Sequence, residues 1–160
     1  MKRLILLLCV LVLGAMTAGQ LRADDNPFLG TWKMNPAKSK AEGSTVPKSL
    51  TRTVTAMGDK VTYSFEGVGA DGSALKYSFT VSYDGKDYPV TGNGMPGGAD
   101  TIAIKRVAPN KTTAVLKKGG KEIATSEIEV SKDGKTATLK MKGTSADGKP
   151  TSGVTVYEKQ

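Results

Sequence analysis

The chain has 160 residues, with 23 basic and 15 acidic side chains, one cysteine and no histidine. The absence of histidine excludes Ser-His-Asp triads, Cys-His nucleophile pairs and histidine-containing zinc sites. The formal net charge of +8 comes from lysines spread along the whole sequence. This pattern favours a solvated lysine surface over a nucleic-acid-binding face, which would concentrate basic residues.

Residues 1–23 show the three parts of a secretory signal peptide. Lys2 and Arg3 precede an apolar run at residues 4–13, and small residues lead up to Ala23. This run is too short to cross a bilayer as a helix, because about 20 apolar residues are needed. We therefore expect cleavage near Asp24, export to the periplasm or the extracellular space, and no integral membrane segment in the mature chain.

The only cysteine, Cys9, lies inside the apolar run, so the mature protein has no thiol and no disulfide. Cleavage also removes Lys2, Arg3 and Arg22, which lowers the formal charge from +8 to +5. The remaining residues 24–160 match the size of one domain. We expect a monomer with no catalytic residues, no metal site, no cofactor and no nucleic-acid partner.

The first predicted strand comes soon after the leader. Residues 30–34 alternate so that Trp32 lies on an apolar face. Asn35 and Pro36 then resemble a helix start, since Asn caps helices and Pro is tolerated at the first helical position. Gly43 would end this helix after at most two turns.

From residue 49 onward the apolar period is two, which predicts short antiparallel strands. Asp-Gly pairs begin at residues 71, 84, 133 and 147, between alternating segments. Tight hairpin turns favour such pairs because they need positive φ. About ten strands are expected in total, the later ones at residues 50–56, 61–66, 75–81, 88–91, 101–107, 112–117, 123–130, 136–142 and 154–159, with a glycine-rich loop at 92–98.

This pattern predicts an all-β fold. The connections are too short for crossover helices, so each strand is expected to pair with its predecessor in an up-and-down antiparallel sheet. About ten strands with one apolar face curl, and closing them into a β-barrel removes the exposed edges. Two packed sheets are the alternative. Many Thr, Ser, Ala and Gly residues at inward positions indicate an incompletely filled interior and therefore a small cavity.

The segment Phe28-Leu29-Gly30-Thr31-Trp32-Lys33 resembles the opening strand of the lipocalins and fatty-acid-binding proteins, the calycin group. The resemblance implies a lipocalin-like β-barrel whose base is closed by Gly30 and Trp32. Residues 135–142, with residues 156–159, look like the last hairpin of the fatty-acid-binding branch. Uncharacterised secreted bacterial lipocalin-like proteins are similar over more of the chain, including residues 83–92, and this similarity implies no activity.

In the fatty-acid-binding branch, the last strand carries an Arg-x-Tyr-Glu-Lys pattern whose arginine and tyrosine hold a ligand carboxylate. Tyr157 matches the tyrosine of this pattern, whereas Thr155 stands where the arginine would be. The resemblance therefore implies a ligand contact at Tyr157 alone.

Arginine is rare past the leader, where eighteen lysines accompany only Arg52 and Arg106. In their predicted strands, both arginines lie on the same face as the apolar residues. A guanidinium that faces a cavity would anchor a carboxylate or phosphate in bidentate fashion. The alternative is an arginine near the barrel rim, with its stem on apolar neighbours and its head in water.

The first functional hypothesis is an exported, non-enzymatic lipocalin-like binding protein for a small apolar or amphipathic ligand. The alternative is a secreted or envelope interaction module, an inhibitor or a scaffold, with a filled barrel and no ligand. A cavity of a few hundred Å³ that reaches an arginine would support the first, and a packed interior the second. The candidate ligand-binding residues are Arg52, Arg106, Tyr63, Tyr77, Phe79 and Tyr157, although the aromatic residues among them also suit an ordinary core.

Overall fold

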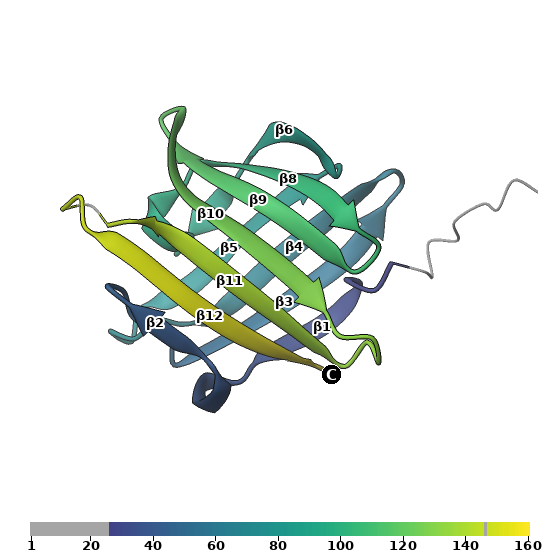
Figure 1. The fold of residues 1–160 in the computed structure, drawn as a ribbon, viewed down its shortest axis with the longest axis horizontal. Helices are drawn as coiled ribbons and strands as arrows, with labels where there is room; N and C mark the ends of the chain where they lie inside the picture. The colour runs from purple at the N-terminus through teal and green to yellow at the C-terminus, as the bar shows by residue number, and fades with distance from the viewer. Residues whose placement is uncertain (1–25, 146) are drawn as a thin grey trace, which may run out of the picture.

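A computed structural model describes residues 26–145 and 147–160, so the predicted signal peptide lies outside the described residues. This part of the chain forms one twelve-stranded sheet in which every pairing is antiparallel (Figure 1). The strands are β1 (Gly30–Met34), β2 (Lys40–Glu42), β3 (Ser49–Met57), β4 (Lys60–Val68), β5 (Ala74–Val81), β6 (Asp84–Pro89), β7 (Thr91–Asn93), β8 (Thr101–Ala108), β9 (Lys111–Lys118), β10 (Lys121–Val130), β11 (Thr136–Thr144) and β12 (Pro150–Lys159). Two single 3₁₀ turns, η2 (Pro36–Lys38) and η3 (Pro96–Gly98), complete the elements. Among the described residues, no helix is long and apolar enough to cross a membrane.

The sheet curls into a nearly closed barrel. Its strand order is β6-β8-β9-β10-β11-β12-β1-β3-β4-β5-β7, and β1 joins the two halves by pairing with both β12 and β3. Figure 1 shows β9 to β12 crossing in front of β3 to β5, with the interior between these two walls. The prediction of an all-β, antiparallel up-and-down barrel is confirmed, and the alternative of two packed sheets is wrong.

Two three-residue strands account for the difference between the twelve strands and the ten or so that the pattern predicts. β2 pairs with β12, and β7 pairs with β5. The Asp84-Gly85 pair, which the pattern places in a turn, starts β6 with a register shift before Asp87. The glycines of all four Asp-Gly pairs have positive φ, as the turn chemistry requires.

The segment after β1 is less helical than the sequence predicts. Asn35 caps it as expected, since its side chain accepts a hydrogen bond from the Lys38 N–H (3.2 Å). The chain nevertheless makes only one 3₁₀ turn, because residues 40–42 leave helical geometry to pair with β12. The predicted helix end at Gly43 is therefore wrong, although Gly43 has positive φ and follows β2.

The barrel has two unlike ends. What we call the closed end carries the short turns that follow β3, β5, β8 and β10, together with Phe28. The largest fully buried side chains gather toward it: Phe28, Trp32, Val54, Val81, Val130 and Tyr157. What we call the open end carries the longer connections at residues 35–48, 69–73 and 90–100. Solid packing toward one end leaves the interior space near the other.

Candidate ligand-binding site

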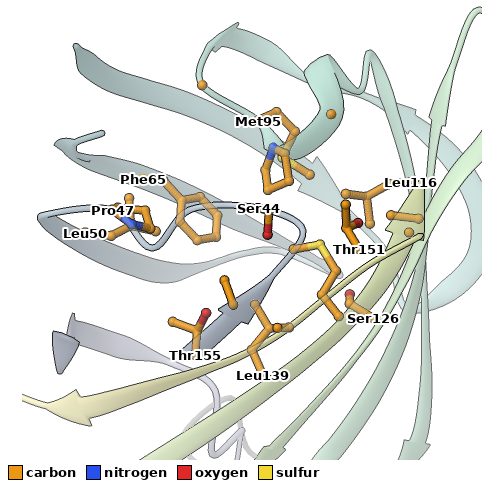
Figure 2. Close-up of a pocket in the computed structure, with 18 of the residues that line it drawn as sticks. Ser44, Pro47, Leu50, Phe65, Met95, Leu116, Ser126, Leu139, Thr151 and Thr155 are labelled. Carbon is orange, nitrogen blue, oxygen red and sulfur yellow. The ribbon is translucent and has the colours of Figure 1, made fainter. Parts of the chain in front are cut away.

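The barrel holds a cavity of about 660 Å³ that lies toward the open end. Residues 43–47, 69–71 and 94–97 line it from the connections, and β3 to β5 and β8 to β12 supply its walls. Figure 2 shows side chains from both sources around one space, with Ser44, Pro47 and Met95 from the connections and Phe65, Leu116, Ser126, Leu139 and Thr155 from the strands. The volume falls within the range of small-molecule pockets, about 300–1,000 Å³.

The two walls of the cavity are built differently, and one of them includes several small side chains. On β4 and β5, cross-strand ring pairs form a thick aromatic wall, with centroids 4.5 Å apart for Phe65 and Tyr77 and 5.1 Å apart for Tyr63 and Phe79. The facing strands β9 to β12 have large lining residues as well, but between them lie small ones, namely Ala114, Ala124, Ser126, Gly143, Gly153 and Thr155. Small residues there leave room that larger ones would fill, which agrees with the incompletely filled interior expected from the sequence.

Arg52 lies on the floor of this cavity. Along β3, Leu50 and Arg52 line the cavity, while Val54 lies below it in the core. The Arg52 side chain is only 3% exposed, and its guanidinium carbon lies 5.2 Å from the ring centroid of Trp32 and 5.1 Å from that of Tyr157. Of the two placements that the strand parity allows, the rim position with the charged head in water is wrong for Arg52.

The Arg52 guanidinium is short of partners. Its Nε and Nη2 atoms are buried and have no hydrogen-bond partner among the described residues. All seven ion pairs found in residues 26–145 and 147–160 use lysine, so no carboxylate there neutralises this charge. Burial lowers the pKa of Arg52, but arginine starts so high that it stays charged at neutral pH. An unpaired buried charge costs several kcal/mol, so the floor of the cavity is complementary to an anion.

Several tyrosines lie near this charge. Tyr63, Tyr77 and Tyr157 all line the cavity. Burial raises the pKa of Tyr157 to about 12 and that of Tyr77 well above its ordinary value, while the nearby Arg52 charge opposes both shifts. The hydroxyl groups therefore stay protonated at neutral pH and can act as hydrogen-bond donors.

Arg106 does not line the cavity. Its guanidinium carbon lies 4.4 Å from the ring centroid of Tyr83 and 5.4 Å from that of Phe28, toward the closed end. Its Nη2 donates a hydrogen bond to Asn26 Oδ1 (2.8 Å). The structure thus places five of the six candidate residues around one space, namely Arg52, Tyr63, Tyr77, Phe79 and Tyr157, and a ligand contact of Arg106 stays a prediction.

Trp32 is fully buried next to the floor. Its Nε1–H donates to the Phe28 carbonyl (2.9 Å), and its ring has Arg52 at 5.2 Å and the Lys159 Nζ at 5.1 Å. Gly30 has a φ of +111°, and a Cβ there would come within 3.0 Å of Lys159 Cε. This placement fits the expected barrel closure by Gly30 and Trp32, whose contribution to stability stays a prediction.

Several residues that line the cavity were not predicted from the sequence. Ser126, Leu139 and Thr155 share the inward parity of their strands, so the two-residue period that indicated Tyr63, Tyr77 and Phe79 could have found them. Met95 comes from the glycine-rich loop, where no period exists to predict its direction. Among the described residues, no group of three or more acidic, histidine or cysteine side chains could hold a metal ion.

No model of a protein family and no curated protein matches the chain. Among solved structures, zebrafish ileal bile acid-binding protein complexed with cholic acid is 16% identical, with a TM-score of 0.50 over 84% of this chain and 99% of that one. Rv2717c from M. tuberculosis is 14% identical, with a TM-score of 0.52 over 84% of this chain and 93% of that one. Likeness at such low identity concerns the fold alone. The fold is calycin-like, which confirms the resemblance seen in the sequence.

Proposed function

We propose that this protein is an exported, non-enzymatic binding protein that holds a small amphipathic ligand in its barrel, with the anionic head of the ligand at Arg52. One observation carries the proposal. A guanidinium without an ionic partner among the described residues lies on the floor of a cavity of about 660 Å³.

The unfilled interior favours this function over an interaction module with a packed barrel. A cavity of a few hundred Å³ that reaches an arginine is the feature that separates the two hypotheses, and the cavity here reaches Arg52. The aliphatic and aromatic side chains around it would shelter an apolar body. A purely apolar ligand would leave the Arg52 charge buried and unpaired, so an amphipathic anion is the better complement.

The placement of Arg52 also fits the altered last strand. In the fatty-acid-binding pattern, an arginine precedes the tyrosine by two positions, and Thr155 takes that position here. The guanidinium carbon of Arg52, from β3, lies 5.1 Å from the ring centroid of Tyr157. An arginine beside the tyrosine is therefore present, supplied by a different strand. The complex of the zebrafish protein with cholic acid supports the use of such a barrel for an acid.

The remaining parts of the proposal rest on the sequence. Export rests on the signal-peptide pattern of residues 1–23, and a single binding domain then spans residues 24–160. The absence of catalysis rests on the missing histidine and on the position of the only cysteine, Cys9, in the leader. We expect the mature protein to act as a monomer.

Native mass spectrometry of the protein purified from its natural host tests the function. We expect a bound small molecule on the wild-type protein that is lost in Arg52→Met. Lys105→Met is the matched control, because it removes one positive charge from an exposed position next to Arg106 and should keep the bound mass. A clean apo mass in repeated wild-type preparations, or a bound mass that survives Arg52→Met, would contradict the proposal.

A further inference from the structure

Arg106 and Tyr83 lie outside the cavity, yet a line of contacts connects them to its floor. The Arg106 guanidinium carbon lies 4.4 Å from the centroid of the Tyr83 ring. The Tyr83 hydroxyl oxygen is 2.7 Å from that of Tyr63, and either hydroxyl can donate. Tyr63 lines the cavity together with Arg52. The order of contacts from the closed end to the cavity is therefore Arg106, Tyr83, Tyr63.

The two arginines share an unusual electrostatic situation. The Nε atom of each is buried without a hydrogen-bond partner among the described residues. Neither arginine belongs to any of the seven ion pairs of that part of the chain. A charge without a counterion acts over a longer distance in the protein interior than in water, because the local dielectric is lower. The Arg106 charge opposes the burial-driven rise of the Tyr63 pKa, so its field reaches this cavity-lining residue although Arg106 itself does not line the cavity.

The Tyr83–Tyr63 hydroxyl pair links the Arg106 charge to the cavity wall through specific contacts. A cation over the Tyr83 ring makes the Tyr83 hydroxyl a stronger donor, since it draws electron density from the oxygen. When Tyr83 donates to Tyr63, the proton of Tyr63 is left free for another acceptor. Burial raises the pKa of Tyr63 well above its ordinary value, so this proton is retained at neutral pH. Hydrogen bonds in such a chain strengthen one another.

We infer that Arg106, acting through the Tyr83–Tyr63 hydroxyl pair, is a positioning residue that sets the affinity of the cavity for an anionic head group. The inference rests on the proposed function and adds that anion selectivity depends on a residue outside the ligand-contact surface. Arg52 supplies the direct charge. Tyr63 supplies a hydroxyl donor, and the hydrogen bond with Tyr83, whose ring lies under Arg106, orients this hydroxyl.

Two fluorescent probes that differ only by an anionic group test the inference. Anilinonaphthalene sulfonate and its neutral parent phenylnaphthylamine share the same rings, so the ratio of their dissociation constants reports anion preference apart from general fit. The purified wild-type protein is compared with Arg106→Gln, Tyr83→Phe, the double variant, Arg106→Lys as the conservative rescue and Lys105→Gln as the matched surface control. Urea midpoints show whether each variant is folded.

We expect Arg106→Gln and Tyr83→Phe each to reduce the preference for the sulfonate by about threefold to tenfold, with the affinity for the neutral probe little changed. The double variant should lose no more than the larger single loss, because both changes interrupt one route. Arg106→Lys should keep most of the preference, and Lys105→Gln should keep all of it.

Three outcomes would overturn the inference. Equal weakening of both probes would mean that Arg106 and Tyr83 only support the fold, and no change would mean that they do not influence the site. Full additivity in the double variant would mean that the two residues act by separate routes. Arg52→Met distinguishes these failures from failure of the proposed function, since only the latter predicts that this variant, too, leaves the sulfonate preference intact.

Discussion

Replacement of Arg52 by methionine should stabilise the ligand-free protein while weakening anion binding. Methionine has a similar length and packs well on aromatic rings, so it can keep the contacts with Trp32 and Tyr157. It removes a charge that has buried, unpartnered nitrogen atoms. The two effects have opposite signs because the same charge is a cost to the empty barrel and an attraction for an anion.

The expected size follows from the contacts. Burial of one ion costs several kcal/mol after relaxation. Two cation–π contacts offset part of this cost, each by roughly 2 kcal/mol when desolvated. The remainder is a gain of about 1–2 kcal/mol in the free energy of unfolding for Arg52→Met, which corresponds to a Tm increase of roughly 3–8 °C for a domain of this size.

The expected effect of Arg52→Met on anion binding is larger than its effect on stability. A hydrogen bond between charged groups contributes about 1.5–3 kcal/mol, so Arg52→Met should weaken anilinonaphthalene sulfonate binding by about 10- to 100-fold. Phenylnaphthylamine, which lacks the charge, should bind within about twofold of the wild-type affinity. Such an exchange of stability for function is typical of binding sites.

Urea unfolding of the ligand-free protein, followed by far-ultraviolet circular dichroism, measures the first effect. Tryptophan fluorescence is unsuitable here because the only tryptophan, Trp32, touches the mutated side chain. Probe titrations measure the second effect, and Lys105→Met is the control for loss of one charge. A destabilised Arg52→Met variant with unchanged sulfonate affinity would refute the reasoning, because Arg52 would then be a satisfied structural residue.

Three further predictions concern closure, the cavity and pH. Trp32→Ala should lower the free energy of unfolding by about 3–5 kcal/mol in urea titrations, as other large core truncations do, and an unchanged Tm would contradict its role in closing the barrel. The double variant Ser126→Leu/Thr155→Leu should fill the cavity and weaken the binding of phenylnaphthylamine by about tenfold or more, without loss of fold. Unaltered binding of this probe would place the ligand elsewhere. Hydrogen bonds from the Lys38 ammonium and the Asn35 amide lower the pKa of Glu158 below its ordinary value of 4.5. The stabilising effect of these bonds is therefore present above pH 4.5 and is lost as the pH falls through the folded-state pKa. NMR titration should show that the Glu158 pKa rises in Lys38→Met.

Much of the fold was predictable because its signals are local. The two-residue period places Leu50, Arg52 and Val54 on one face of a strand, and the structure buries all three. The same parity explains why Tyr63, Tyr77 and Phe79 enter the cavity wall. Alternation in an antiparallel strand is set by the backbone itself, so it holds without knowledge of the strand's neighbours.

The short strands were not predictable because distant partners decide them. Residues 40–42 follow a helix-start signal at Asn35, yet they pair with β12, which is more than a hundred positions away. A segment of three residues has too little intrinsic preference to resist such pairing. The Ser39 hydroxyl donates to the Asn35 carbonyl of the turn and accepts a hydrogen bond from the Val156 N–H of β12 (3.1 Å), so the turn ends where the strand contacts begin.

The sequence also could not predict which of the two arginines lines the cavity. Strand parity turns both Arg52 and Arg106 inward, but it carries no information about depth along the barrel. Arg52 pairs with Trp32 and Phe65 in mid-strand, whereas Arg106 pairs with Thr112 beside a turn of the closed end. Only the register across several strands decides which guanidinium meets the cavity.

The sequence by itself determined the antiparallel strands, the Asp-Gly turns, the inward parity of the two arginines and the shortage of large side chains inside. Each depends on residues close in the chain or on composition. The tertiary structure alone decided that the barrel nearly closes, that the remaining space lies above Arg52, and that Arg106 lies behind Tyr83 and Tyr63. A cavity is a property of side chains that face one another from strands far apart in the sequence, so its position appears only when those strands are brought together.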